Sequence, residues 1–395
     1  MGKRLNRLFT VLLFLFVALA AYYLGATHPP KESGSTNTLD FQAVEKKINE
    51  IQKVVDRSFL YDYENEELEN GIYKGYVNSL KDIYTEYYTV QEYKDLEEQN
   101  QGAFGGVGIE VSAAKGQFIE VVSPIKGTPA DQAGIKSGDR IIKIDGQEYT
   151  SDMLTDAVGV MRGEPGTDVT LTILRTVSGQ DEQLDLTITR QIINIQSIHS
   201  QMLEDELGYI QITNFQANTA KQFFEAYQTL KDEGAKKMIL DLRNNPGGLL
   251  DVTLEIADFL LPQGDIMHVK YKDDSTESYS TDAKMDDMPM VVLINQGSAS
   301  ASEILSGAIK DFERAEIIGE NTFGKGVVQT IVPFSDGSGM KITMAEFYTP
   351  NHKQIHGIGI APTKEVILDE NTSAIGPENL DQDNQLQAAI DYLNK

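Results

Sequence analysis

The stretch that decides the fold of this chain is Met290–Ile294 (MVVLI), followed by Asn295–Ile309 (NQGSASASEILSGAI). The first run is continuously apolar, which predicts a buried strand. Beyond Glu303 the apolar residues recur at helical spacing, so the small residues between the two runs form a strand-to-helix turn. A turn of this kind presents a serine at the helix N-terminus. There, free backbone N–H groups and the positive end of the helix dipole stabilise an oxyanion.

A second informative stretch is Thr322–Gln329 (TFGKGVVQ), which offers one lysine, Lys325, in a glycine-rich turn that leads into a strand. Serine together with lysine can replace serine together with histidine in amide hydrolysis. Lysine has an ordinary pKa of about 10.4 and serves as a base only when burial in apolar surroundings lowers it. Phe323, Val327 and Val328 are suitable apolar neighbours. The two stretches therefore indicate a serine hydrolase with a lysine base.

The order and spacing of both stretches resemble the carboxyl-terminal processing (tail-specific) proteases of the S41 serine peptidase family. The resemblance extends from Phe41 to Leu368. It implies that the middle serine of the SASAS run, Ser300, is the nucleophile, that Lys325 is the general base, and that Gln329 holds the lysine in place. A glutamine suits this role because it accepts a hydrogen bond from the amine without adding a negative charge that would raise the lysine pKa.

The oxyanion of such a reaction needs preorganised N–H donors. The backbone N–H of Ala301, directly after the nucleophile, is the expected first donor. The second is expected from the loop Asp241–Gly248 (DLRNNPGG), which resembles the turn at a strand end in the family. We select Gly247 within this loop, with Gly248 as the nearest alternative. A turn that merely ends a strand is the non-catalytic interpretation.

Residues 102–190 differ in character, because short β-rich runs alternate with glycine turns. Thr128–Gly134 and Gly138–Ile142 resemble a PDZ domain. This likeness implies capture of a substrate's free, apolar C-terminus as an added strand, with the carboxylate bound by N–H groups of a glycine-rich loop. A glycine-rich hairpin without ligand is the alternative. Arg162, beyond the helical run of this segment, is a candidate for a regulatory contact with the core or the substrate. The expected carboxylate-binding residues are Gly106, Val107, Gly108 and Ile109.

From residue 191 onward strand-like and helical runs alternate, which predicts an α/β core. The chain is therefore expected to be a multi-domain α/β protein, α+β overall. The resemblance implies a crotonase/Clp-like β-spiral for the protease core and a homodimer formed through the N- and C-terminal helices. The expected segments are a transmembrane anchor or signal segment (1–25), a linker (26–40), an N-terminal helical region (41–100), a PDZ domain (102–190), an S41 protease core (191–370) and an acidic C-terminal helical tail (371–395).

Composition excludes several functions. The chain has 395 residues, with 60 acidic against 34 basic side chains and a formal charge of −26. Such a charge repels the phosphate backbone, so nucleic acid is not an expected partner. The absence of cysteine excludes disulfides, cysteine–zinc sites and a thiol nucleophile. The expected partners are protein or peptide substrates, and neither a cofactor nor a metal is expected.

The N-terminus indicates export. Lys3, Arg4 and Arg7 precede an apolar run at residues 8–24. This run is near the lower length limit of a membrane-spanning helix, and the positive charges keep its start in the cytoplasm. We therefore expect a single-pass cell-membrane protein whose catalytic part is extracytoplasmic. The alternative is a secreted protein, because the small residues of Ala18–Ala20 also fit a signal-peptide cleavage site.

Two other classes of protein compete with this interpretation. A membrane-anchored PDZ adaptor with an inactive core is disfavoured because Ser300, Lys325 and Gln329 are all present. A Ser–His–Asp hydrolase is disfavoured because Ser300 lacks the G-x-S-x-G frame. In addition, no histidine stands in a motif with an acid; the histidines are His28, His199, His268, His352 and His356.

The chain departs from the family pattern at two turn positions. His352 stands where a glycine usually follows Asn351, and Thr363 stands where an aspartate usually follows Pro362. Neither position has a catalytic role, so these departures put turn geometry in question and leave the expected activity unchanged.

Overall fold

The computed structural model describes residues 39–113, 118–203, 206–282, 285–370 and 372–395. The chain divides into two compact units, one up to Glu67 and one from Leu68 onward, and each is described by itself. Within the described ranges, no helix is long and apolar enough to cross a membrane. The apolar run 8–24 and most of the expected linker lie outside these ranges, so the anchor stays a prediction.

The first unit contains the amphipathic helix α2 (Phe41–Ser58). Its N-terminus is capped by Asp40, whose carboxylate accepts hydrogen bonds from two N–H groups of the first turn. No residue of α2 is buried, and the apolar side chains of Phe41, Ile51 and Val54 are exposed. The helix therefore presents an apolar stripe to solvent.

Helix α3 (Asn65–Asn78) leads from the first unit into the second. The chain then forms a short strand, β1 (Glu86–Tyr88), and helix α4 (Val90–Gln101). Gly102 ends α4 in the left-handed conformation, with φ 65°. The region expected to be helical thus also contributes one strand, and that strand becomes part of a sheet of the α/β core.

Residues 103–194 form the PDZ-like part of the second unit. Its antiparallel sheet has the strand order β3-β4-β5-β7-β8, with β6 on β5, and the entry and exit strands β2 and β9 pair with each other. Branched aliphatic side chains of this sheet pack against Ala157 and Met161 of helix α6. The elements are β2 (Ala103–Gly106), β3 (Ile109–Ser112), β4 (Ile119–Pro124), α5 (Pro129–Gln132), β5 (Arg140–Ile144), β6 (Gln147–Glu148), the 3-10 helix η1 (Ser151–Met153), α6 (Leu154–Met161), β7 (Asp168–Val177), β8 (Gln180–Thr189) and β9 (Gln191–Asn194).

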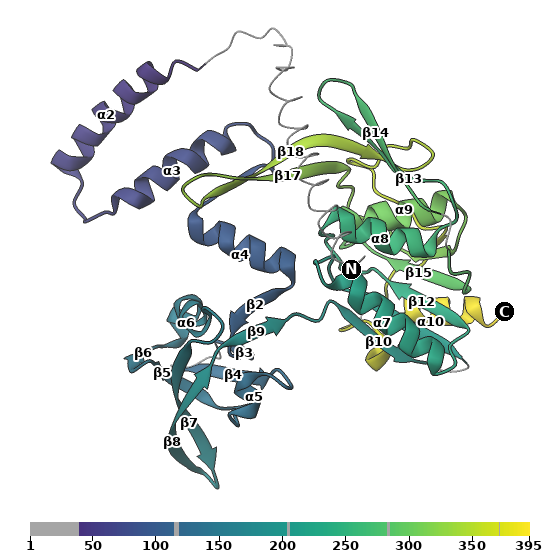
Figure 1. Cartoon of the computed structure of the whole chain (residues 1–395), viewed down its shortest axis with the longest axis horizontal. Helices are drawn as coiled ribbons and strands as arrows, with labels where there is room; N and C mark the ends of the chain where they lie inside the picture. Colours follow the sequence, from purple (N-terminus) through teal and green to yellow (C-terminus); the bar gives the residue numbers. More distant parts are fainter. Residues whose placement is uncertain (1–38, 114–117, 204–205, 283–284, 371) are drawn as a thin grey trace, which may run out of the picture. The chain divides into compact units, whose positions relative to one another are not determined.

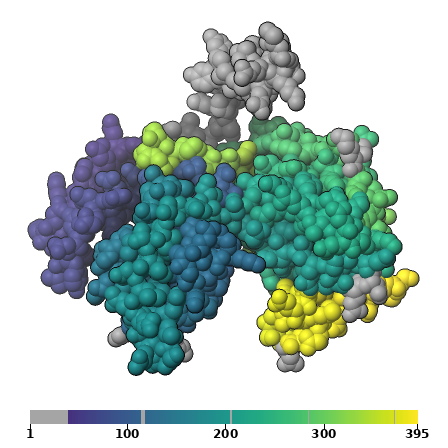
Figure 2. All heavy atoms as spheres, turned by 60° about the horizontal axis from the view of Figure 1, so that its bottom comes forward, coloured from purple at the N-terminus to yellow at the C-terminus, as the bar shows by residue number. Residues whose placement is uncertain are grey.

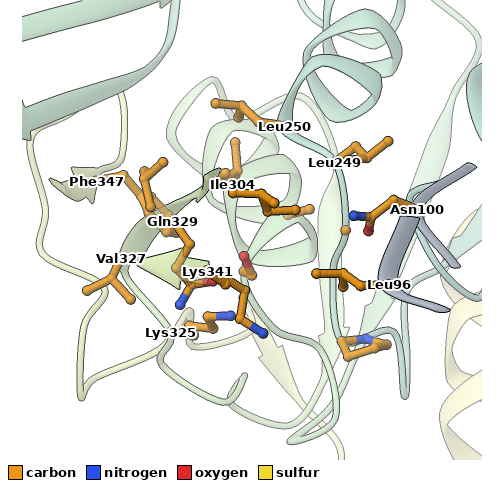
Figure 3. A pocket seen from close by; sticks show the side chains of 16 residues that line it. Leu96, Asn100, Leu249, Leu250, Ile304, Lys325, Val327, Gln329, Lys341 and Phe347 are labelled. Carbon is orange, nitrogen blue, oxygen red and sulfur yellow. The ribbon is translucent and has the colours of Figure 1, made fainter. Parts of the chain in front are cut away.

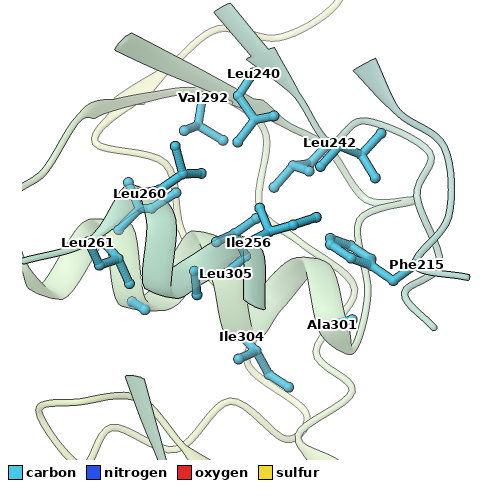
Figure 4. Packing of buried hydrophobic residues seen from close by; sticks show 14 of the residues in the cluster. Phe215, Leu240, Leu242, Ile256, Leu260, Leu261, Val292, Ala301, Ile304 and Leu305 are labelled. Atoms are coloured by element: carbon cyan, nitrogen blue, oxygen red, sulfur yellow. The ribbon is translucent and has the colours of Figure 1, made fainter. Parts of the chain in front are cut away.

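The α/β core is built on a six-stranded sheet with the order β10-β11-β12-β15-β16-β19, in which every neighbouring pair is parallel except β10 with β11. Strand β15 (Met290–Ile294) is buried along its whole length, as its apolar run predicts. Helices α7–α9 pack on one face, where Leu240 and Val292 meet Ile256 and Leu305 (Figure 4). The other elements are β10 (Ile198–Met202), β11 (Leu207–Ile212), α7 (Thr219–Asp232), β12 (Lys237–Asp241), α8 (Leu250–Leu260), α9 (Ala301–Asp311), β16 (Glu316–Gly319) and β19 (Lys364–Glu365).

A second sheet carries the lysine stretch. Strand β18 (Gly339–Tyr348) pairs antiparallel with β1, β13 and β17, and β14 pairs with β13. Lys325 lies just before β17 (Val327–Pro333), and a bulge interrupts the β17–β18 register between Val328 and Gln329. Because a bulge redirects the side chains beside it, it helps decide where Gln329 points. The remaining strands are β13 (Asp265–Tyr271) and β14 (Thr276–Ser280).

The C-terminal helix α10 (Asn384–Leu393) covers the other face of the six-stranded sheet. Leu386 and Ala389 are fully buried in the cluster that contains Ile239 and Leu293. Figure 2 shows this yellow segment lying on the surface of the core, preceded by the 3-10 helix η2 (Pro377–Asn379). The apolar side of α10 is therefore occupied within one chain.

The two departures from the family pattern have structural counterparts. His352 adopts φ 56°, a conformation that glycine enters without strain, which explains why glycine is usual there. Its ring stacks on that of His268 with centroids 3.9 Å apart. Thr363 uses its hydroxyl to accept from Ile317 N (2.8 Å) and to donate to Ile317 O (3.0 Å). Both turns are thus held by local contacts.

The expected multi-domain α/β organisation, with N-terminal helices, a PDZ-like sheet and a mixed-sheet core, is confirmed (Figure 1). The finer likeness of the core to a β-spiral stays a prediction. For the site, the important consequence is that the serine stretch and the lysine stretch belong to two different sheets, which meet at the N-terminus of α9.

Candidate active site

The serine and lysine stretches meet at a cavity of about 260 Å³. Ser300, Lys325 and Gln329 all line it, so the structure brings together the three residues selected from the sequence. Figure 3 shows Lys325 and Gln329 on one side of the cavity and residues of α4 on the other. The rest of the lining is mostly apolar: Leu96, Asn100, Pro246, Gly248, Leu249, Leu250, Ala301, Ile304, Val327, Val328, Ile331, Lys341 and Phe347.

Ser300 differs from the other two serines of its run. The hydroxyl of Ser298 donates to Leu242 O (2.8 Å) and that of Ser302 donates to Asn245 O (3.0 Å), and both side chains are fully buried. Ser300 is partly exposed, and at the N-cap of α9 it adopts φ 51° and ψ −111°. A non-glycine residue at positive φ is strained, and such strain concentrates at active sites. Two serines thus stabilise the loop, while the middle one faces the cavity.

Glu303 joins the two stretches. Its fully buried carboxylate accepts four hydrogen bonds, which satisfy both oxygens. The contact fixes the backbone of the lysine turn against the first turn of α9, so Glu303 positions Ser300 and Lys325 relative to each other. The donors are Ser300 N (2.9 Å), Gly324 N (2.7 Å), Lys325 N (2.8 Å) and the hydroxyl of Thr322 (2.6 Å).

Gly247 lies directly against Ser300. A Cβ at this position would come within 2.9 Å of Ser300 Cβ and of Ala301 N, so a side chain does not fit. The N–H of Gly247, however, already donates to Asn245 Oδ1 (2.8 Å). Gly248 lines the cavity, and in the described chain neither its N–H nor that of Ala301 donates a hydrogen bond. Ala301 and Gly248 therefore each present a free amide at the cavity.

Lys325 is half-buried, and its ammonium group lies over the ring of Tyr84, 4.9 Å from the centroid. Burial lowers the pKa of Lys325, and the positive charge of Lys341 lowers it further. The carboxylates of Glu303 and Asp82 act in the opposite direction, but the pKa of Lys325 stays below the ordinary lysine value. This is the direction that a lysine base requires.

Gln329 lies beside the bulge of β17, and its Nε2 is buried without a hydrogen-bond partner among the described residues. Its register partner on β18 is Thr343, so Gln329 and Lys341 project from the same face of the β17–β18 pair. In the part of the chain that the structure describes, no hydrogen bond joins Lys325 Nζ to Gln329 or to Ser300. The three side chains share the cavity without direct hydrogen bonds.

The PDZ-like part has its own cavity of about 80 Å³ between β3 and α6, and the expected loop Gly106–Ile109 lines it. The carbonyls of Val107 and Gly108 accept hydrogen bonds from the N–H groups of Ala130 and Ile125, each at 2.9 Å. Across the described residues, the N–H groups of Val107 and Gly108 themselves donate none. The loop is thus held by its carbonyls and presents its amides, as carboxylate binding requires.

Arg162 ends α6 and lines the same cavity. Its Nη1 donates to Glu98 (3.3 Å), its guanidinium lies 4.7 Å from the ring centroid of Phe104, and its Nε is buried without a partner among the described groups. Glu98 belongs to α4, which also places Leu96 and Asn100 in the catalytic cavity. One helix therefore contacts both cavities.

Sequence reasoning missed several residues of the catalytic cavity. Lys341 has no motif signal, because it reaches the cavity only through the pairing of β18 with β17 and β1. Tyr84 and Leu96 come from the N-terminal helical region, far from the two stretches. Glu303 stands one helical turn beyond Ser300, where an acid that only stabilises the helix dipole is equally plausible from sequence.

Of the described histidines, His199 and His268 lie away from the cavity, whereas His356 is close to it and its buried Nδ1 has no hydrogen-bond partner among the described residues. His268 hydrogen-bonds through Nδ1 to Ser278 (2.7 Å) and stacks on His352. His356 lies beside the lysine turn, with its ring 6.3 Å from that of Tyr84, and His199 lines a separate surface pocket. Among the described residues, no cluster of histidine and acidic side chains could hold a metal ion.

Known proteins resemble this chain in sequence and in fold. The model of peptidase family S41 matches residues 206–366, and a PDZ domain model matches residues 120–175. The carboxy-terminal processing protease CtpA of Bacillus subtilis is 36% identical over 362 residues, which covers 91% of this chain and 77% of the relative. The carboxyl-terminal-processing protease of Synechocystis is 33% identical over 100% of this chain and 95% of its own length.

A solved structure of an S41 protease from Bacteroides fragilis superposes with a TM-score of 0.51 over 81% of this chain and 90% of that one. At 15% identity this likeness shows the shared fold. The relatives establish that the chain belongs to the S41 family of serine peptidases. Within that family it is a carboxyl-terminal processing protease with a PDZ domain.

Proposed function

We propose that Ser300 and Lys325 form the catalytic dyad of this protease. The observation that carries the proposal is that Ser300, alone among the three serines of its run, shares a cavity with a lysine whose pKa is lowered by burial. Neutral Nζ takes the proton of Oγ as the Oγ–C bond forms at the scissile carbonyl. The ammonium then protonates the leaving amine as the C–N bond breaks, and water hydrolyses the acyl-enzyme to release a carboxylate.

Gln329 orients Lys325 in this mechanism. Its amide lies in the same cavity, and its Oε1 accepts from Nζ when the lysine side chain turns from Tyr84 toward Ser300. A neutral acceptor directs the amine without stabilising its protonated form.

The oxyanion is stabilised by the N–H groups of Ala301 and Gly248. This replaces the expected Gly247, because the N–H of that residue is taken up by Asn245. Gly247 instead lets the loop approach the nucleophile, since any side chain there would collide with Ser300. Two preorganised amides at this place would contribute roughly 10²-fold or more each to the rate.

The protease cleaves after an apolar residue. Leu249, Leu250, Ile304 and Phe347 line the cavity next to Ser300, and burying an apolar side chain against them stabilises the bound substrate. A charged side chain would lose its hydration there, and the two cavity lysines are the ionic partners that the described lining offers it.

The PDZ domain captures the free C-terminus of the substrate at the amides of the Gly106–Ile109 loop. Arg162 connects this event to catalysis, because it lines the PDZ cavity and binds Glu98 of α4, whose Leu96 lines the catalytic cavity. Arg162→Ala should therefore reduce the difference in turnover between substrates with a free and with an amidated C-terminus. An unchanged difference would remove Arg162 from this connection.

The test of the dyad compares the three serines. Ser300→Ala should lose turnover by a factor of about 10⁴ or more while it still binds a labelled peptide with a free, apolar C-terminus. Ser298→Ala and Ser302→Ala are the matched controls and should keep substantial turnover, because their hydroxyls bind backbone carbonyls. Cleavage by purified Ser300→Ala would overturn the assignment. Tight peptide binding by a wild-type chain that cleaves nothing would instead favour the adaptor.

The chain is proposed to be anchored in the cell membrane by residues 8–24, with its catalytic part outside the cytoplasm. The support is the apolar run after Lys3, Arg4 and Arg7. Membrane fractionation after alkaline washing tests this proposal. Recovery of the mature protein in the soluble exported fraction, beginning after Ala20, would establish signal cleavage instead.

A homodimer is proposed to form through α2, whose apolar stripe with Phe41, Ile51 and Val54 is exposed. The C-terminal helix is not proposed to contribute its apolar side, because that side packs on the core sheet. Sedimentation of wild type and of Ile51→Glu tests the interface, and an unchanged mass would exclude it.

A further inference from the structure

The catalytic cavity contains two lysines and no carboxylate. Lys325 and Lys341 both line it, and none of the other described residues in its wall is acidic. Acidic residues outnumber basic ones by 60 to 34 in the chain as a whole, so a cavity lining with two lysines and no carboxylate differs from the overall composition. Lys341 has no part in the dyad, and its place in the cavity needs an explanation of its own.

Lys341 is held in place by the strand next to it. It lies on β18 between β1 and β17, opposite Glu86 on one side and Ile331 on the other. Its Nζ donates to the hydroxyl of Tyr88 (2.5 Å), lies 5.2 Å from the Tyr88 ring centroid and is 3.7 Å from the carboxylate of Glu86. These contacts fix the ammonium group instead of letting it turn into solvent.

The same segment of chain positions the catalytic lysine. Tyr84, two residues before β1, has its ring under the Lys325 ammonium, while Tyr88 of β1 has its ring beside Lys341. Residues 84–88 therefore hold one lysine at each end. Both ammonium groups thus contact aromatic rings of this short segment.

We propose that Lys341 acts on the catalytic base through its positive charge and not by contact with the substrate. Its ammonium group repels a proton from Lys325 and so favours the neutral form of the base. The inference rests on the proposed role of Lys325. Like charges that share a poorly solvated cavity favour the loss of one proton. The ammonium group of Lys341 has the carboxylate of Glu86 within 3.7 Å, whereas among the described residues no carboxylate bonds to the amine of Lys325.

The other groups around the base define the balance that Lys341 shifts. Burial and Lys341 lower its pKa, while the carboxylates of Glu303 from α9 and Asp82 from the turn before β1 raise it. The ring of Tyr84 favours the ammonium form, and the pKa of this tyrosine is itself raised by burial, so its phenol stays neutral. His356 lies beside Tyr84 from the loop after β18. Removing Lys341 should therefore raise the pKa of Lys325, because the two carboxylates would then act against burial alone.

The test is the pH dependence of kcat/KM for Lys341→Met and Lys341→Arg. In Lys341→Met the acidic limb should move to higher pH, with roughly tenfold lower kcat/KM at about pH 7 and recovery toward wild type at about pH 10. Lys341→Arg keeps the positive charge and should keep the limb. Lys353→Met, which removes an exposed lysine bonded to Asp311, is the control for net charge.

A purely structural role of Lys341 would lower activity equally at every pH in both variants, and that result would overturn the inference. Lys341→Gln replaces the methionine variant if the latter does not fold. In a Ser300→Ala background, the pH at which Lys325 becomes reactive toward an amine-acetylating reagent, followed by mass spectrometry, should rise on removal of Lys341. Activity of Lys325→Ala would refute the dyad itself; an inactive Lys325→Ala with an unmoved limb in Lys341→Met refutes only the inference.

Discussion

Two cations, one buried and one half-buried, flank the loop that carries Ser300, and their surroundings differ in kind. Arg243 is almost wholly buried and binds two carboxylates: Nη2 donates to Asp241 (2.6 Å) and to Asp383 (2.8 Å). Lys325 is half-buried and shares a largely apolar cavity with a second lysine, Lys341, which lies beside it (Figure 3). Arg243 is thus bound by two carboxylates, whereas Lys325 lies in a cavity whose described lining contains no carboxylate.

The comparison shows that the charged partners of a cation decide in which direction its pKa moves once burial has lowered it. Burial alone would lower the pKa of Arg243, but Asp241 and Asp383 raise it above the ordinary value. For Lys325 burial and Lys341 act together, and its pKa falls. The first cation can therefore serve as a permanent tie, and the second as a base.

The buried ion pairs of Arg243 with Asp241 and Asp383 connect two parts of the fold. Asp241 ends β12, Arg243 starts the loop that carries Gly247, and Asp383 caps α10 by accepting from Leu386 N (2.9 Å). Arg243 thus links the loop beside the nucleophile to the C-terminal helix. Removing one carboxylate leaves the guanidinium with a single anionic partner in a site without water access.

The largest expected effect comes from exchanging the cation at the base. Lys325→Arg should reduce kcat/KM by roughly 10⁴-fold, because arginine stays protonated at any usable pH. The melting temperature should change little, since the half-buried position tolerates a long cationic side chain. Lys221→Arg, at an exposed position on α7, is the control and should keep full activity. Substantial cleavage by Lys325→Arg would show that this cation is not the base.

The second effect concerns stability. Asp383→Ala should lower the free energy of unfolding by about 3 to 5 kcal/mol, because it breaks a buried ion pair and removes the cap of α10. Urea denaturation measures it. Asp391→Ala, an exposed acid on the same helix, should change stability by no more than about 0.5 kcal/mol. Equal effects of both substitutions would mean that the Arg243 tie contributes nothing specific.

The decrease of the free energy of unfolding at low pH provides a sharper form of this test. Burial alone would raise the pKa of Asp383, but the hydrogen bonds and charge of Arg243 hold it below the ordinary value. The resulting stabilisation is complete above the unfolded pKa of about 3.9 and is lost as the pH falls through the folded pKa. Asp383→Asn should remove this part of the pH dependence, so the stability curves of wild type and variant should converge at low pH.

The smallest effect is expected at His356. This histidine lies beside Tyr84 and near the carboxylate of Asp82, so it is a described histidine at the site that has an acid close to it. If Lys325 is the base, His356→Gln should change kcat/KM by less than about threefold, with the pH profile unchanged. His268→Gln provides the comparison at a histidine bonded elsewhere. A loss at His356 as large as that at Lys325 would restore the histidine-based alternative.

Much of the site was predictable because its chemistry is encoded locally. The apolar run Met290–Ile294 and the small residues after it specify a strand, a turn and a helix, which place Ser300 at the helix N-terminus. Lys325 and Gln329 stand in one glycine-rich turn and its strand. These features depend on neighbours within a few residues, so the sequence determines them, together with the α/β alternation and the PDZ-like pattern.

Tertiary structure alone decided the partners of these residues. Glu303 bonds to the lysine turn, Lys341 enters the cavity through strand pairing, and α10 covers the core sheet through Leu386. It also decided which glycine amide is free, because the side chain of Asn245 folds back onto Gly247. Each of these contacts joins segments or orientations that local spacing leaves open. The sequence by itself therefore determines which groups can react, while sheet register and packing set the charges and hydrogen bonds that let them do so.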